Sequence, residues 1–193
     1  MHSEDFTPTD GAFAKVEMNS GVEEKSPLRG RYDFVCIGAD GKVKWTDSIE
    51  NVVVTVGKND MLDKYFQGSS YTAAWYMGLI DNTSVGAGPA IGNTLSSHSP
   101  WLEFLGYNYA SSGTNRASVS WAAASAGAKS STAAVFNITA SGTIYGALLC
   151  TTQARNTTTD GGAGILFSAG AFSGTRAVIN NDTLNVTYTL TLN

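Results

Sequence analysis

The chain has 193 residues and a formal net charge of −4, with 42% hydrophobic and only 15% charged residues. This length is sufficient to bury a core, and it predicts one large all-β body with an appendage. The chain is acidic and lacks the positively charged surface of proteins that bind nucleic-acid backbones. No apolar run approaches the length of a membrane-spanning helix, about 20 residues. We therefore expect no direct nucleic-acid partner and no membrane partner.

Residues 1–28 show neither helical nor alternating periodicity, contain Pro8 and Pro27, and mix charged with small residues. They predict an extended N-terminal arm, with a disordered terminus as the alternative. The same region has no apolar signal-peptide core, so we expect a soluble protein that is not secreted by the usual route. The body is expected to span residues 29–193.

The first part of the body, residues 29–68, is predicted to contain a hairpin, a further strand and one short helix. Residues 31–37 and 42–45 flank the turn 38–41, whose Asp40-Gly41 pair suits a tight hairpin turn. The β-branched run at residues 51–57 predicts the third strand.

The helix is predicted over residues 60–67, with Asn59 as its N-terminal cap and Gly68 at its end. Its apolar residues fall on one face, which is expected to lie against the sheet. They are Met61, Leu62, Tyr65 and Phe66.

Short β segments separated by Gly, Ser, Asn and Asp follow in residues 69–193. Eight segments without intervening helices predict a β-sandwich or jelly roll of mainly antiparallel strands. The last alternates apolar and polar residues, as expected for a strand with one buried face. The Ala/Ser-rich residues 121–134 favour a strand, a loop and another strand over a helix. The predicted segments cover residues 73–80, 100–107, 117–122, 132–139, 143–152, 163–168, 174–179 and 183–192.

The stretch TAAWYMGLID at residues 72–81 is apolar on both faces of a strand. Trp75, Met77 and Leu79 would point to one side, with Tyr76 and Ile80 on the other. We expect one face to be covered by the opposite sheet, and the second by the helix or by a neighbouring subunit.

Catalytic signals are weak. His98 has no nucleophile-elbow motif beside it and is interpreted as a surface loop residue. Asp160 and Asp182 are explained by turns, which leaves Asp81 and Glu103 without a sign that they face each other. We expect no enzyme activity and no catalytic residues.

Metal and cofactor motifs are also missing from the sequence, so no metal, no cofactor and no cofactor-binding residue is expected. Cys36 and Cys150 have no partner at metal-ligand spacing. They are expected to be buried free thiols, with a single disulfide as the alternative. The five N-x-Ser/Thr sequons are interpreted as a by-product of Asn- and Thr-rich β structure.

Large aromatic residues lie within the apolar or alternating segments. A core or subunit-contact role is more common for such residues than a sugar-binding platform. The candidate core or subunit-contact aromatics are Trp45, Tyr65, Phe66, Trp75, Tyr76, Trp101, Trp121 and Tyr188.

Charge divides the chain unevenly. Residues 1–66 hold 12 of the 16 acidic and 8 of the 12 basic residues, so only 8 charges remain in residues 67–193. Globular surfaces are usually about a quarter to a third charged. A body with so little charge is poorly protected against self-association unless other subunits cover its surface. The sequence therefore predicts an assembly protein that forms a symmetric homo-oligomer, either a dimer or a trimer.

Several segments together resemble small structural proteins of tailed bacteriophage particles. They include the hairpin with residues 40–45, residues 51–57, 60–66 and 74–81, the late GTIYGA at 142–147 and the closing DTLNVTY at 182–188. The likeness runs from about residue 30 to the C-terminus, and its motifs are structural. It implies a non-enzymatic cement or decoration protein in the virion, on the outer capsid surface, with the major capsid protein as its partner.

Under this resemblance the arm would lie across neighbouring capsid subunits, through main-chain hydrogen bonds and apolar contacts. Its candidate capsid-contact residues are Phe6, Phe13, Val16, Met18 and Val22. Two alternatives stay open. One is a tail, neck or fibre component, and the other is a carbohydrate-binding host-attachment module using exposed Trp101, Tyr107 or Tyr109.

Overall fold

The computed structural model describes residues 28–68, 70, 74–83, 86, 88–110, 112–155 and 164–192. The predicted arm and its five candidate contact residues lie outside these ranges. Leu28, the last residue assigned to the arm, instead begins the first strand.

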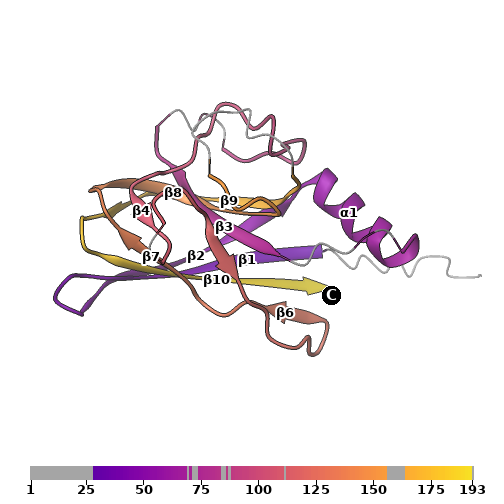
Figure 1. Ribbon diagram of the computed structural model, residues 1–193, viewed down its shortest axis with the longest axis horizontal. Helices are drawn as coiled ribbons and strands as arrows, with labels where there is room; N and C mark the ends of the chain where they lie inside the picture. Colours follow the sequence, from indigo (N-terminus) through magenta and orange to yellow (C-terminus); the bar gives the residue numbers. More distant parts are fainter. Residues whose placement is uncertain are drawn as a thin grey trace, which may run out of the picture.

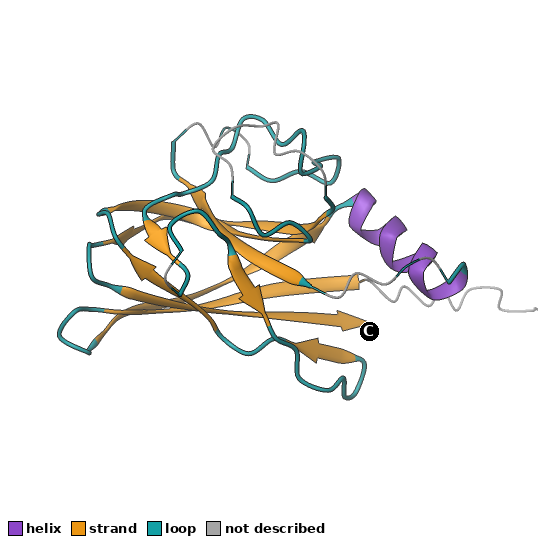
Figure 2. Ribbon diagram, viewed as in Figure 1, coloured by secondary structure: helices purple, strands orange, loops and turns teal. Residues whose placement is uncertain are grey.

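The regular structure of the described residues consists of β-strands and a single helix (Figures 1 and 2). The predicted all-β class, mainly antiparallel with one short helix, is confirmed. The elements in chain order are β1 (Leu28–Ile37), β2 (Val43–Val53), α1 (Thr55–Phe66), β3 (Trp75–Asp81), β4 (Tyr107–Asn108), β5 (Ala117–Val119), β6 (Ala128–Ser130), β7 (Ala134–Ile138), β8 (Gly142–Cys150), β9 (Leu166–Val178) and β10 (Thr183–Leu192).

The strands follow the order β4-β7-β10-β1-β2-β9-β8-β3-β5, and β6 also pairs with β10. Strand β2 belongs to both halves of this curled, sandwich-like sheet. Most of its length pairs with β1, whereas only Val52 and Val53 pair with β9. The main core fills the space between the two halves, with Tyr32, Phe34 and Tyr188 from one half facing Met77, Leu79 and Phe172 from the other.

The predicted hairpin is confirmed. The Gly38 N–H donates to Lys42 O, and Gly41 adopts φ 77°, which glycine reaches at little steric cost. The alternation in β10 is confirmed too, because Leu184, Val186 and Tyr188 are fully buried while the residues between them are half-buried. The turn residues of the hairpin and the alternating residues of β10 therefore indicate, in the sequence itself, the structures that these two segments adopt.

Strand β3 is covered on both faces, as its apolar residues predict. Met77 and Leu79 face the main core, whereas Ile80 and Tyr76 belong to a second cluster with Leu95 and Trp101. The expected cover of this second face by the helix or another subunit is wrong. Residues of the chain's own loop between β3 and β4 cover it, with the Asp81 N–H donating to Leu102 O.

The helix begins earlier than predicted. Residues 54–57 were expected to extend a strand and Asn59 to cap the helix, but β2 continues unbroken to Val53 and α1 starts at Thr55. Val54 is the N-terminal cap residue and supplies no side-chain hydrogen bond. Its own N–H instead donates to Phe167 O on β9, so tertiary contact determines where the strand ends.

Two further strand predictions are wrong in detail. Residues 163–168 and 174–179 fall largely in one long strand, β9, which pairs with β8 through two register shifts. The shift between Ile144 and Gly146 passes over residues 172–175 of β9, and the shift between Leu149 and Cys150 passes over Phe167. The predicted strand at 100–107 is mostly irregular, with a single bridge between Glu103 and Ile80. In contrast, the Ala/Ser-rich stretch is β-structured as predicted, with β6 after a turn at Ala126 and Gly127.

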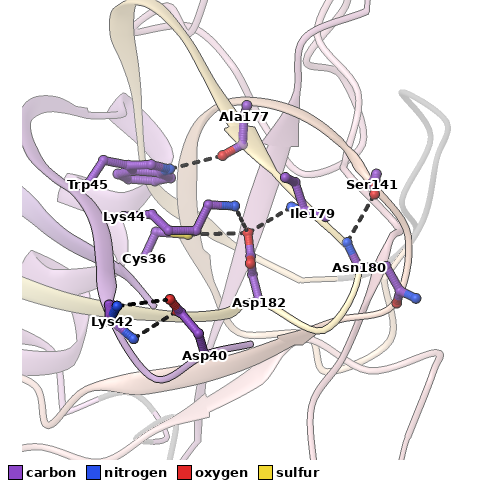
Figure 3. A network of polar contacts seen from close by, with 10 residues as sticks. All are labelled: Cys36, Asp40, Lys42, Lys44, Trp45, Ser141, Ala177, Ile179, Asn180 and Asp182. Carbon is purple, nitrogen blue, oxygen red and sulfur yellow. Dashed lines mark hydrogen bonds and ion pairs between the residues drawn. The ribbon is translucent and has the colours of Figure 1, made fainter. Parts of the chain in front are cut away.

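A polar network closes the β1–β2 turn against the β9–β10 turn (Figure 3). The Asp182 carboxylate is 3% exposed and accepts hydrogen bonds from Lys44 Nζ at 2.6 Å and from the Ile179 N–H at 2.8 Å. Burial alone would raise the pKa of Asp182, but these two hydrogen bonds outweigh it, so its pKa lies below the ordinary value. Burial and the neighbouring Asp182 raise the pKa of the Cys36 thiol to about 11.

Replacing Asp182 with Asn should lower the free energy of unfolding by about 2–3 kcal/mol at pH 7, because charge-assisted hydrogen bonds are lost. A depressed carboxyl pKa stabilises the fold above the unfolded value of about 3.9, and this stabilisation disappears as pH falls through the folded-state pKa. The difference between wild type and Asp182→Asn should therefore shrink below about pH 4. Urea unfolding of both proteins at several pH values measures this difference in the free energy of unfolding.

The matched control is Asp40→Asn, because Asp40 is exposed and its carboxylate lies 4.0 Å from Lys42 Nζ. Exposed pairs contribute about 0–1 kcal/mol, so this variant should unfold close to wild type. An equal loss in both variants, or a loss for Asp182→Asn that persists unchanged at low pH, would contradict the assignment.

Candidate interaction surface

Helix α1 is attached to the sheet by its first turn and projects from one end of the sandwich (Figure 2). Gly57 is buried, and a Cβ there would lie 2.6 Å from Phe167 O and 2.8 Å from Phe167 Cα. Only glycine lets the helix backbone approach β9 this closely. The Thr55 N–H also donates to Ile91 O, which ties the start of the helix to the loop after β3.

The outer side of α1 exposes three large apolar residues. Leu62 is 49% exposed, Tyr65 81% and Phe66 75%, and the Tyr65 and Phe66 rings meet edge to face at 4.9 Å. The prediction that all four apolar residues of the helix lie against the sheet is therefore wrong, because only Met61 packs onto the core. The sequence spacing places Leu62, Tyr65 and Phe66 together, but cannot say whether another part of the same chain covers them.

An apolar groove with a volume of about 320 Å³ lies on the inner side of α1. Its walls come from the helix, from β3, β8, β9 and β10, and from the segment around β6. Charged side chains occur at Asp60, Lys64 and Lys129, with Lys64 Nζ 3.2 Å from the Asp60 carboxylate. The other lining residues are Met61, Tyr65, Trp75, Trp121, Leu149, Phe167 and Leu190.

Two of the predicted contact aromatics face this groove while packing on the core. The Trp75 ring meets Phe167 edge to face at 5.3 Å, and the Trp121 ring meets Tyr188 at 6.1 Å. Trp121 Nε1 is buried without a hydrogen-bond partner. Together with Tyr65, they make this end of the sandwich the place where predicted aromatics gather.

The remaining predicted aromatics serve the interior. Trp101 and Tyr188 are fully buried, and Trp45 and Tyr76 are partly buried against the two core clusters. Trp45 Nε1 also donates to Ala177 O at 2.9 Å, which joins β2 to β9 where the two strands diverge (Figure 3). A core role therefore accounts for these four, whereas the described part of the chain leaves Tyr65 and Phe66 exposed.

A buried ion pair between Glu103 and Arg116 was not predicted. The Arg116 guanidinium is bound to the Glu103 carboxylate through Nε, at 3.1 and 3.2 Å, and through Nη2. Its Nη1 donates to Thr152 O at 2.7 Å, and both side chains are at most 1% exposed. The available signal was the isolation of each charge in a long neutral region, with Glu103 inside the apolar run Trp101–Leu105.

His98 is 1% exposed, so its interpretation as a surface loop residue is wrong. Its ring stacks on Trp101 with centroids 3.9 Å apart, and its Nδ1 lies 2.9 Å from Trp101 O. The carboxylate of Glu103, which the sequence left as a candidate carboxylate, is bound to Arg116. The geometry therefore gives His98 a packing role within the loop that covers β3.

Both cysteines are buried free thiols, as the sequence favours. Burial raises the pKa of the Cys150 thiol to about 11, which keeps it protonated near neutral pH. Over the described residues, no group of three or more His, Cys, Asp or Glu side chains is placed to hold a metal ion.

Two of the three rings considered for a sugar platform, Trp101 and Tyr107, are not available at the surface. Trp101 and Tyr107 are 0% exposed, and Tyr109 packs partly buried against the core. Arg155 additionally covers Tyr107, with its guanidinium carbon 4.4 Å from the ring centroid. Fully buried rings cannot stack on a sugar that approaches from solvent.

Neither a scan against models of known protein families nor a search of curated proteins finds a match to this chain. In the part of the chain that the structure describes, no helix is long and apolar enough to cross a membrane.

The part of the body with little charge, residues 67–193, has even fewer charges on its surface than in its sequence. Of its eight charged residues, Glu103, Arg116 and Asp182 are buried. Arg176 is paired with Asp47, its Nε lying 2.6 Å from the carboxylate. Much of the outer surface built from residues 74–192 therefore consists of Ala, Ser, Thr, Gly and Asn.

Proposed function

We propose that this chain is a non-enzymatic structural protein of a tailed-bacteriophage virion. In this proposal it is a cement or decoration protein that binds the outer head surface as a homo-oligomer and stabilises contacts between major capsid subunits. The sequence segments that resemble such proteins support the proposal, and so does the low charge of the surface built from residues 67–193.

The observation that carries the proposal is the apolar side of α1, which no described residue covers. Leu62, Tyr65 and Phe66 form one patch on a helix that projects from the β body. Exposed apolar patches on otherwise polar surfaces mark sites of protein contact, and aromatic residues are enriched at the centres of interfaces. We assign this patch to the contact with a capsid subunit.

Repetition on a lattice makes such a small patch sufficient. A contact that is weak for one copy becomes effective when an oligomer engages several equivalent sites at once. A neutral surface also lets neighbouring copies approach each other without electrostatic repulsion. A tail or neck component would use the same physics with far fewer copies.

Binding to heads tests the proposal directly. Purified heads that lack this chain are mixed with the recombinant protein and sedimented, with isolated tails as a parallel sample. The protein should sediment with heads at a stoichiometry comparable to that of the capsid protein and remain in the supernatant with tails. Retention on tails alone would contradict the head assignment.

A further inference from the structure

The groove on the inner side of α1 is an apolar site without an occupant among the described residues. Its volume of about 320 Å³ lies at the lower end of the range for ligand pockets, about 300–1,000 Å³. Met61, Trp75 and Leu190 expose apolar atoms in the groove, and covering these atoms would be energetically favourable. The groove adjoins the outer patch through Tyr65, which belongs to both, whereas Leu62 and Phe66 do not line it.

The start of β1 lies next to this groove. Leu28 pairs with Leu192, and Leu190, two residues along the same strand, lines the groove. Diagonal neighbours on paired strands are about 7–8 Å apart, so residue 27 joins the body close to the groove. Figure 1 shows β1 beginning, and β10 ending, on the side of the molecule where α1 projects.

The 27 residues before Leu28 have suitable length and composition to reach and fill the groove. Six residue steps from Leu28 to Val22 can span up to about 20 Å when extended. Residues 13–22 contain Phe13, Val16, Met18 and Val22, and the more polar residues 23–27 join them to β1. Attachment to the same chain gives this segment an effective concentration in the millimolar range.

The charges of the two parts are compatible. Residues 1–27 contain six acidic residues and two lysines, whereas residues 28–193 contain ten acidic and ten basic residues. Lys129 stands at the groove with its Nζ donating to Ala122 O, and Lys64, paired with Asp60, lies on the α1 wall. Both would lie near the glutamates that flank the apolar residues of the segment.

We propose that residues 13–22 of the chain dock into the α1 groove, with Phe13 or Met18 packing against Trp75 and Leu190. This goes beyond the proposed function and can be tested without a capsid. A second copy's helix, or a free apolar ligand, would be a different occupant of the same groove.

Photo-crosslinking in the full-length chain tests the proposal. Phe13 is replaced by the photo-reactive analogue p-benzoylphenylalanine, the purified protein is irradiated, and the cross-linked peptides are identified by mass spectrometry. We expect cross-links concentrated on the peptides that contain Met61, Trp75 and Leu190. Mixing isotopically light and heavy chains then shows whether the segment binds its own copy or a neighbouring one, and either pairing supports the proposed occupant.

A matched pair of charge substitutions sharpens the test. Tyr65→Glu places a negative charge at the groove, whereas Phe66→Glu places the same charge one residue away, outside its lining. Both residues are highly exposed, so both variants should fold, which circular dichroism checks. Tyr65→Glu should reduce the groove cross-links at least fivefold, and Phe66→Glu should leave them within twofold of the parent. Absence of groove cross-links, or equal effects of the two substitutions, would overturn the proposal.

Discussion

Replacing Arg116 with Met is expected to lower the free energy of unfolding by about 3–5 kcal/mol. The substitution leaves the Glu103 carboxylate, 1% exposed, without its cation in the interior. It also removes the donor to Thr152 O, which joins this pair to the end of β8. For a domain of this size, the loss corresponds to a fall in melting temperature of roughly 10 °C, measurable by calorimetry.

The double variant Glu103→Leu with Arg116→Met separates loss of charge pairing from loss of packing. Buried ion pairs replaced by apolar residues of similar volume are often neutral or stabilising. The double variant should therefore recover most of the stability lost in Arg116→Met. If Arg116→Met alone loses less than about 1 kcal/mol, the pair is not the buried, mutually dependent unit described above.

Removing the outer patch of α1 is expected to abolish the retention of the protein on heads. In the triple variant Leu62→Ser, Tyr65→Ser and Phe66→Ser, the side chains that we assign to the capsid contact are lost. They are 49%, 81% and 75% exposed, so the β body should keep its stability. Central aromatic residues often contribute 2 kcal/mol or more each to an interface, so binding should fall by at least about 100-fold.

Val43→Ser is the matched control, since Val43 is also an exposed apolar residue, at 59%. It begins β2, whereas α1 follows the other end of that strand, about 33 Å away at strand spacing. This variant should bind heads like wild type. Equal binding by the triple variant would show that the patch is not the capsid contact, and equal loss in both variants would indicate a nonspecific solubility effect.

Local sequence signals predicted the parts of the fold that local physics determines. The Asp40-Gly41 turn, the alternation of β10 and the two apolar faces of β3 each depend on a backbone angle or on a period of two residues. These features were confirmed because each follows from residues that are neighbours in the sequence.

Tertiary contacts decided what the sequence could not. The start of α1 depends on Val54 and Gly57 meeting Phe167, more than a hundred residues away. His98 is buried because its own loop, between β3 and β4, folds over β3, and the Glu103–Arg116 pair joins two segments with no shared motif. For the outer patch of α1, the sequence identified the aromatic residues Tyr65 and Phe66 but did not predict that they are exposed.

The position and copy number of this chain in a purified particle test the central proposal most directly. Electron cryomicroscopy of virions should show the β body on the outer head surface, in hundreds of copies arranged with the capsid lattice, with α1 against a capsid subunit. Density for the chain only at the neck or tail, in about a dozen copies or fewer, or its absence from the particle, would contradict the account.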